Sequence, residues 1–118
     1  MLVTILDAKA KLEAEGLRVS HNNPHSLWIA ATVRDVAAGI KLSDDACSLT
    51  CNSNRWVAVF PAQGLFTYEV SGSPAELVST IATVYAYYRR GGGSLTDSFK
   101  QVVPNAEQYL VGRSPTHV

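Results

Sequence analysis

Two cysteines and two histidines are the residues whose types and spacing could form a metal site. Cys47 and Cys51 are four residues apart, as are His21 and His25, and two thiolates with two imidazoles can bind zinc. However, both cysteines alternate with polar residues along ACSLTCN (46–52), which is typical of a β-strand, where they would lie ~13 Å apart. This distance is too long for a disulfide. We therefore expect two small core residues, histidines in an exposed loop and no metal site.

Groupings for acid–base or nucleophilic catalysis are sparse. The chain has no G-x-S-x-G motif, and the glycines at 91–93 lie between two predicted helices and lack the lysine of a phosphate-binding loop. The candidate acids are Asp44, Asp45, Glu69, Glu76 and Asp97. Glu76 and Asp97 occupy positions where they would cap helices. The sequence leaves an enzyme open but favours a protein without catalytic activity, and it indicates no cofactor.

The stretch VYAYYRRGGG (84–93) combines three tyrosines, two arginines and three glycines. At ~100° per residue, Tyr85 and Tyr88 fall on the buried stripe of a helix, whereas Tyr87 falls on the opposite side. Arg89 and Arg90 lie in the last turn, where cations favour the negative end of the helix dipole. Because tyrosine and arginine are enriched in binding hot spots, we predict a partner-binding surface here.

The predicted contact residues for a protein partner are Tyr87, Arg90 and Arg89, together with the acidic pair Asp44 and Asp45. A second interpretation places a small molecule or substrate between the sheet and the helix over 73–90. The residues predicted to line that pocket are Trp56, Tyr68, Tyr85 and Tyr88. The two interpretations differ in the surface they need, since a ligand requires a concave apolar pocket and a partner an exposed aromatic patch.

Three helix starts are marked by Ser or Thr followed three residues later by an acid, as in a capping box. They stand at Thr4, Ser73 and Ser94. The first helix should end at Gly16, the second at Gly91 and the third before Pro104. Lys9 with Glu13 and Lys11 with Glu15 are spaced as i,i+4 ion pairs on the first helix.

Three segments between these helices alternate as strands do: 46–52, 55–61 and 65–70. Short turns make them an antiparallel meander, to which 17–21 could add a fourth strand. Residues 26–38 fit both a helix, which we favour, and a strand returning from 17–21. If the three helices cover one face of the sheet, Val57, Val59 and Leu65 need cover on the other, from 26–38, a partner or a second copy.

Length and composition indicate one cytoplasmic domain over 1–118, with 105–118 as a loosely packed tail. The fold class is α+β: a three- or four-stranded antiparallel meander with an N-terminal helix and two C-terminal helices. Apolar residues make up 47% and ten basic residues balance ten acidic ones, which disfavours nucleic acid as a partner. We find no signal peptide and no apolar stretch long enough to cross a membrane.

By elimination, the sequence predicts a small protein-binding module. Small stand-alone domains of this design often act as immunity proteins or antitoxins, which inhibit a partner by stoichiometric occlusion. That comparison rests on the fold class and on no motif. A near-zero net charge also does little to prevent self-association, so a homodimer is a further expectation.

Overall fold

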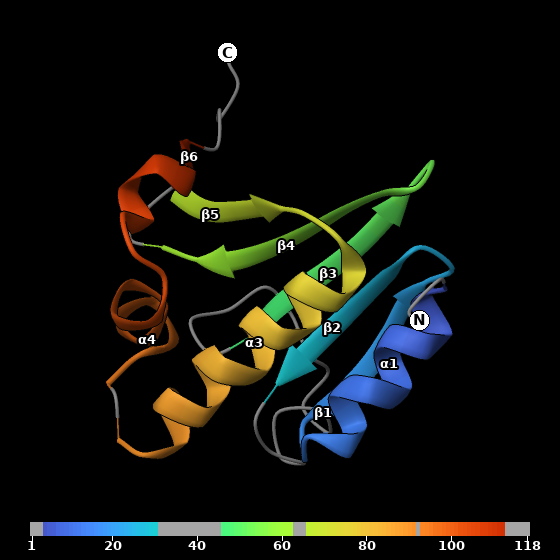
Figure 1. The fold of residues 1–118 in the computed structure, drawn as a ribbon, viewed down its shortest axis with the longest axis horizontal. Coiled ribbons are helices and arrows are strands. Elements are labelled where there is room, and N and C mark those ends of the chain that lie inside the picture. The colour runs from blue at the N-terminus through green and yellow to red at the C-terminus, as the bar shows by residue number, and fades with distance from the viewer. Residues whose placement is uncertain (1–3, 31–45, 63–65, 92, 113–118) are drawn as a thin grey trace.

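The sheet has more strands than the sequence predicted. A computed structural model describes residues 4–30, 46–62, 66–91 and 93–112. In these ranges the elements are α1 (Ile5–Ala14), β1 (Arg18–Asn23), β2 (Ser26–Ala30), β3 (Ala46–Asn52), β4 (Arg55–Pro61), β5 (Phe66–Ser71), α3 (Pro74–Arg89), α4 (Leu95–Val102), a 3₁₀ helix η1 (Ala106–Tyr109) and β6 (Leu110–Gly112). The α+β class and the helices at either end are confirmed, but the expected three or four strands are six (Figure 1).

The three predicted helix starts are confirmed by their hydrogen bonds. The side-chain oxygen of Thr4 accepts from the backbone N–H of Asp7, and that of Ser94 from the N–H of Asp97. Ser73 forms a full capping box with Glu76. Such bonds satisfy N–H groups that the first helical turn leaves without partners. The start signals in the sequence therefore act locally, as the pattern indicated.

The sheet is an antiparallel meander in which strand order follows chain order, from β1 to β6. β3 and β4 are joined through Ser53 and Asn54, whose φ angles are 50° and 67°. Two consecutive positive φ angles are the geometry of a type I′ hairpin, whose twist matches that of the flanking strands. β1, β3, β4 and β5 lie where alternation predicted them, with boundaries shifted by a residue or two.

The preference for a helix over residues 26–38 is wrong for its first five residues. Ser26–Ala30 is strand β2, which pairs with β1 on one side and with β3 on the other. Leu27 and Ile29 are fully buried. The apolar residues of this segment fit the periodicity of a helix as well as that of a strand. Pairing with the neighbouring strands therefore determines that Ser26–Ala30 forms a strand. Residues 31–38 lie outside the described ranges.

The segment after Pro104 forms an additional strand. Asn105 adopts a left-handed conformation with φ 55°, after which η1 leads into β6. β6 pairs with β5 through Thr67 opposite Val111. The Tyr109 ring meets Phe99 edge-on, with centroids 6.4 Å apart. This pairing is made with a strand about forty residues earlier in the chain, so local alternation gave no signal for it.

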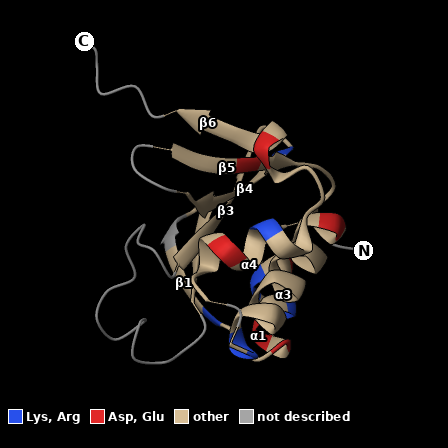
Figure 2. Cartoon of the chain, turned by 90° about the vertical axis from the view of Figure 1, so that its left-hand side faces the viewer, with Lys and Arg blue, Asp and Glu red and all other residues tan. Residues whose placement is uncertain are grey.

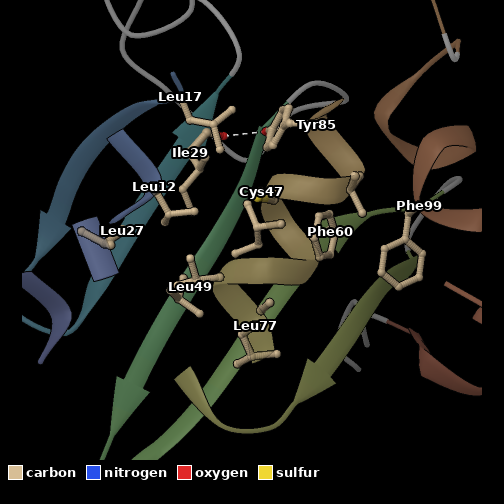
Figure 3. Close-up of a cluster of buried hydrophobic side chains, with 14 of the residues drawn as sticks. Leu12, Leu17, Leu27, Ile29, Cys47, Leu49, Phe60, Leu77, Tyr85 and Phe99 are labelled. Carbon is tan, nitrogen blue, oxygen red and sulfur yellow. Dashed lines mark hydrogen bonds between the residues drawn. The ribbon is translucent and has the colours of Figure 1, made fainter. Parts of the chain in front are cut away.

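The core lies between the sheet and the three α-helices, which all pack on one face (Figures 1 and 2). α1 packs on β1 and β2, while α3 and α4 pack on β4. The buried strand residues on this helix-facing side are Leu27, Ile29, Cys47, Leu49, Trp56, Ala58, Phe60 and Tyr68 (Figure 3 labels five of these). None of the helices within the described ranges is both long and apolar enough to cross a membrane.

Candidate functional site

The face of the sheet away from the three α-helices is the candidate binding surface. Alternation along the strands places side chains there that include Arg18, Ser20, Ser26, Trp28, Ser48, Thr50, Arg55, Val57, Val59, Thr67 and Glu69. We call this set the outer face. Ser20, Trp28, Thr50, Val57 and Val59 are half-buried, Ser26, Ser48 and Thr67 are buried, and the three charged residues are exposed. All of them lie in strands β1 to β5, so a rigid sheet sets their relative positions.

Trp28 lies in a row of paired residues across the outer face. Its neighbours in the register are Ser20 on β1 and Ser48 on β3, and Val59 is next on β4. A tryptophan flanked by serines leaves the sides of its ring without bulky neighbours on the adjacent strands. An adjacent row contains Ser26 and Thr50, whose hydroxyl oxygens are 3.0 Å apart. This arrangement offers one large aromatic surface beside small hydroxyl groups.

The centre of the outer face is poor in charge. Its three charged residues lie away from Trp28 on β2: Arg18 is on the edge strand β1, Arg55 begins β4 beside the β3–β4 turn, and Glu69 is on β5. The centre of a protein–protein interface is depleted in charged residues and enriched in aromatic ones, whereas its rim is polar. The outer face has this arrangement, and most of the residues coloured as charged in Figure 2 lie on the helices.

The contact residues predicted at the end of α3 have different surroundings. Arg89 donates to the backbone carbonyl of Gly16 at 2.6 Å and to that of Glu15 at 3.4 Å. It therefore binds the carbonyl groups at the end of α1, which the helix leaves without internal partners. Tyr87 is half-buried and Arg90 is exposed. The remaining predicted contacts, Asp44 and Asp45, lie outside the described residues.

The four aromatic residues predicted to line a pocket belong to one hydrophobic core, with Tyr88 partly buried and packed against it. Trp56, Tyr68 and Tyr85 are only 7%, 3% and 1% exposed. Tyr68 stacks on Phe99 at 4.5 Å, and Tyr85 meets Tyr88 edge-on at 6.0 Å. These rings thus pack on neighbours in the core. A groove that the structure does contain lies elsewhere, between α1 and α3.

A buried hydrogen bond joins α3 to the sheet next to Cys47 (Figure 3). The Tyr85 hydroxyl donates to the backbone carbonyl of Ile29 at 2.8 Å. Burial raises the pKa of Tyr85 well above its usual value, and the neighbouring Cys47 adds to this rise. Burial also raises the pKa of the Cys47 thiol to about 12, although its hydrogen bond with Tyr85 opposes the shift. A thiol with such a pKa stays protonated at neutral pH and is a poor nucleophile.

Those residues considered for metal binding and catalysis that the structure describes do not form a common site. Cys47 and Cys51 are both free thiols. Within the described ranges, no three His, Cys, Asp or Glu side chains gather where they could hold a metal ion. Glu76 belongs to the capping box, where hydrogen bonds from Ser73 lower the pKa of its carboxyl group. Asp97 lies in the first turn of α4. These acids stabilise helix ends.

Sequence reasoning did not single out Trp28. A strand over 26–30 places Leu27 and Ile29 on one face and therefore Trp28 on the other. That signal was present in the alternation of SLWIA, but it was readable only under the strand interpretation. Comparisons of the chain with protein-family models, with curated proteins and with solved structures gave no match.

Proposed function

We propose that this protein is a protein-binding module that contacts its partner through the outer face of its sheet. The observation that carries the proposal is the half-buried Trp28 among the uncharged Ser, Thr and Val side chains at the centre of the outer face. Tryptophan is the residue type most enriched in binding hot spots. Arg18, Arg55 and Glu69 lie around this centre, as charged residues do at the polar rim of an interface.

The proposed mode of action is stoichiometric occlusion, as in immunity proteins and antitoxins. A rigid sheet suits this mode, because its side chains are already held in position and little conformational freedom is lost on binding. Tyr87 and Arg90 form a second predicted contact at the end of α3. Arg89 is less suited to that role, because its guanidinium group already binds α1.

The placement of the aromatic residues does not favour the small-molecule alternative. Ligand pockets are concave and keep part of their apolar lining accessible. Trp56, Tyr68 and Tyr85 are instead buried within the hydrophobic core. A ligand could reach them only by displacing core packing.

The test is quantitative capture of a partner by the immobilised protein from native lysate, followed by titration with the purified partner. We expect one protein to be retained at a fixed stoichiometry. The variant Trp28→Ser should weaken its binding at least about thirtyfold, as for a hot-spot tryptophan. Circular dichroism of the same variant should remain that of the wild type, since Trp28 lies outside the helix-facing core.

The matched control is Leu6→Ser on α1, because Leu6 is 61% exposed and has the same potential for non-specific apolar contact. This variant should retain the partner with wild-type affinity. Equal losses in the two variants would indicate non-specific adhesion and contradict the proposal. Loss in Tyr87→Ser with retention in Trp28→Ser would move the site to the end of α3.

A further inference from the structure

α1 and α3 lie side by side (Figure 1), and a groove lies between them. Its volume is about 560 Å³ and it is open to solvent. The lining residues are Lys11 of α1 and Glu15, which is the C-cap of α1, with Ala75, Val78, Ser79, Ala82 and Thr83 from α3. Because Arg89 at the end of α3 binds Glu15 and Gly16 at the end of α1, the two helices run parallel along this groove.

The α3 side of the groove is built from small side chains. Ala75, Ser79 and Ala82 are spaced by four and three residues, so they share one side of the helix. Val78, which is 4% exposed, contributes an apolar wall. Small residues in such a row let another helix approach closely. The groove therefore suits a helix better than a bulky flat partner.

The α1 side of the groove carries one positive and one negative charge, one helical turn apart. Lys9 and Glu13 have the same spacing and order, and they form an ion pair at 3.2 Å. In the part of the chain that the structure describes, Lys11 and Glu15 form no ion pair with each other or with another side chain. The predicted pair Lys9–Glu13 is thus confirmed, and the pair Lys11–Glu15 is wrong. These two charges are available to a partner at the groove.

We propose that the groove holds a second copy of this chain, with the two α1 helices antiparallel about a twofold axis. In an antiparallel pair centred midway between residues 11 and 15, Lys11 of each copy faces Glu15 of the other. One contact surface thereby forms two identical ion pairs, as a twofold interface requires. Both charges come from the same face of the same helix, so this surface is complementary to itself.

This dimer would leave the outer face accessible, because the groove and the outer face lie on opposite sides of the sheet. It therefore differs from a dimer formed through the sheet, which would bury Trp28. It is also independent of the proposed partner, since either interaction can fail without the other. A molecule with both surfaces would bind two partner molecules per dimer.

The test is a charge-reversal cycle measured by sedimentation equilibrium. Lys11→Glu places two glutamates opposite each other at both contacts, and Glu15→Lys does the same with two lysines. Each single variant should raise the dimer dissociation constant by about tenfold or more, because two attractive contacts become repulsive. The double variant K11E/E15K restores opposite charges and should return to within about threefold of the wild type.

The control variant is Lys100→Glu, which makes the same charge change on α4 and should leave the dissociation constant unchanged. Ser79→Arg, which fills the groove, should abolish the dimer. The proposal is overturned if the wild type stays monomeric up to about 1 mM, beyond which association would be weaker than specific complexes are. It is also overturned if the single variants dimerise as the wild type does, if the double variant does not recover, or if only Trp28→Ser disrupts the dimer.

Discussion

At the scale of single residues, Tyr85 is the buried polar contact between α3 and the sheet. Its ring is part of the core, and its hydroxyl donates to the carbonyl of Ile29. A buried hydroxyl without a partner would cost free energy, so this bond fixes how α3 lies over β2.

Replacing Tyr85 with phenylalanine should lower the free energy of unfolding by about 1 kcal/mol, the typical net value of such a hydrogen bond. The ring remains, so core packing is retained and the Ile29 carbonyl loses a donor. Urea unfolding followed by circular dichroism would measure the change. A loss near zero would mean that water replaces the tyrosine hydroxyl at Ile29.

Cys47 makes stability sensitive to alkaline pH. Its thiol has a pKa of about 12 when folded and 9.0 as the reference value, so the unfolded chain loses this proton first. The stabilisation is complete below pH 9.0 and is lost as pH rises towards 12. Each pH unit in that interval should remove on the order of 1 kcal/mol from the free energy of unfolding.

Urea midpoints of wild type and Cys47→Ala, measured at neutral pH and at successive steps above pH 9.0, would test this. The alanine variant should begin about 1 kcal/mol less stable because of the lost packing, and its midpoint should fall less steeply. Because Cys47 also raises the pKa of Tyr85, the difference between the two curves reports the titration of this coupled pair. Parallel curves would contradict the prediction.

Among the helices and strands, α3 is stabilised by the capping box that Ser73 and Glu76 form at its N-terminus. The Ser73 hydroxyl accepts from the N–H of Glu76, and the Glu76 carboxylate accepts from the N–H of Ser73. These contacts begin the helix that covers the centre of the sheet.

Ser73→Ala should cost about 1 kcal/mol of unfolding free energy at neutral pH, as for other N-cap losses. Since hydrogen bonds to Ser73 lower the pKa of Glu76 below 4.5, the contribution of the box is present above that pH and declines as Glu76 is protonated. The difference between wild type and Ser73→Ala should therefore be smaller in acid. Thermal unfolding at both pH values would measure it.

The control for this experiment is Thr80→Ala in the same helix. The Thr80 hydroxyl donates back to the Glu76 carbonyl, a local bond that adds little to a helix whose backbone is already paired. This variant should be neutral or more stable by a few tenths of a kcal/mol. A loss as large as that of Ser73→Ala would show that α3 responds to any polar deletion in its first turns.

The sequence predicted those elements whose signals are local. Caps at Thr4, Ser73 and Ser94, and alternation over 46–52 and 55–61, depend on neighbouring residues and were confirmed. β2 and β6 depend on partners elsewhere in the chain, so their own residues did not specify them. The hydrogen bond of Arg89 was not predicted for the same reason, because its acceptor, the carbonyl of Gly16, is 73 residues away in the chain.

At the scale of the whole molecule, the sheet has one face that holds the core and one that does not. Adjacent residues of β2 divide between these faces: Ile29 is fully buried against the helices, and Trp28 is half-buried on the outer face. Side-chain size alone would rank Trp28 as the more important of the two for stability.

Ile29→Ala should lower the free energy of unfolding by about 2–4 kcal/mol, because it leaves a cavity in the core. Trp28→Ala should cost about 1 kcal/mol or less, since Trp28 lies on the outer face and is not part of the helix-facing core. Guanidinium unfolding of the two variants gives the comparison directly. A larger loss at Trp28 would mean that the outer face carries part of the core.

The neighbour-by-neighbour order of the strands has a consequence during synthesis. β1 to β5 can pair in turn as each leaves the ribosome, because every strand meets the one made just before it. The apolar side of β3 and β4 stays uncovered until α3 has been synthesised, and α3 ends only at Arg89. At ~5–20 residues per second, synthesis from the end of β4 at Pro61 to Arg89 takes about one to six seconds. During that interval the nascent chain exposes apolar strand surface of the kind that chaperones bind.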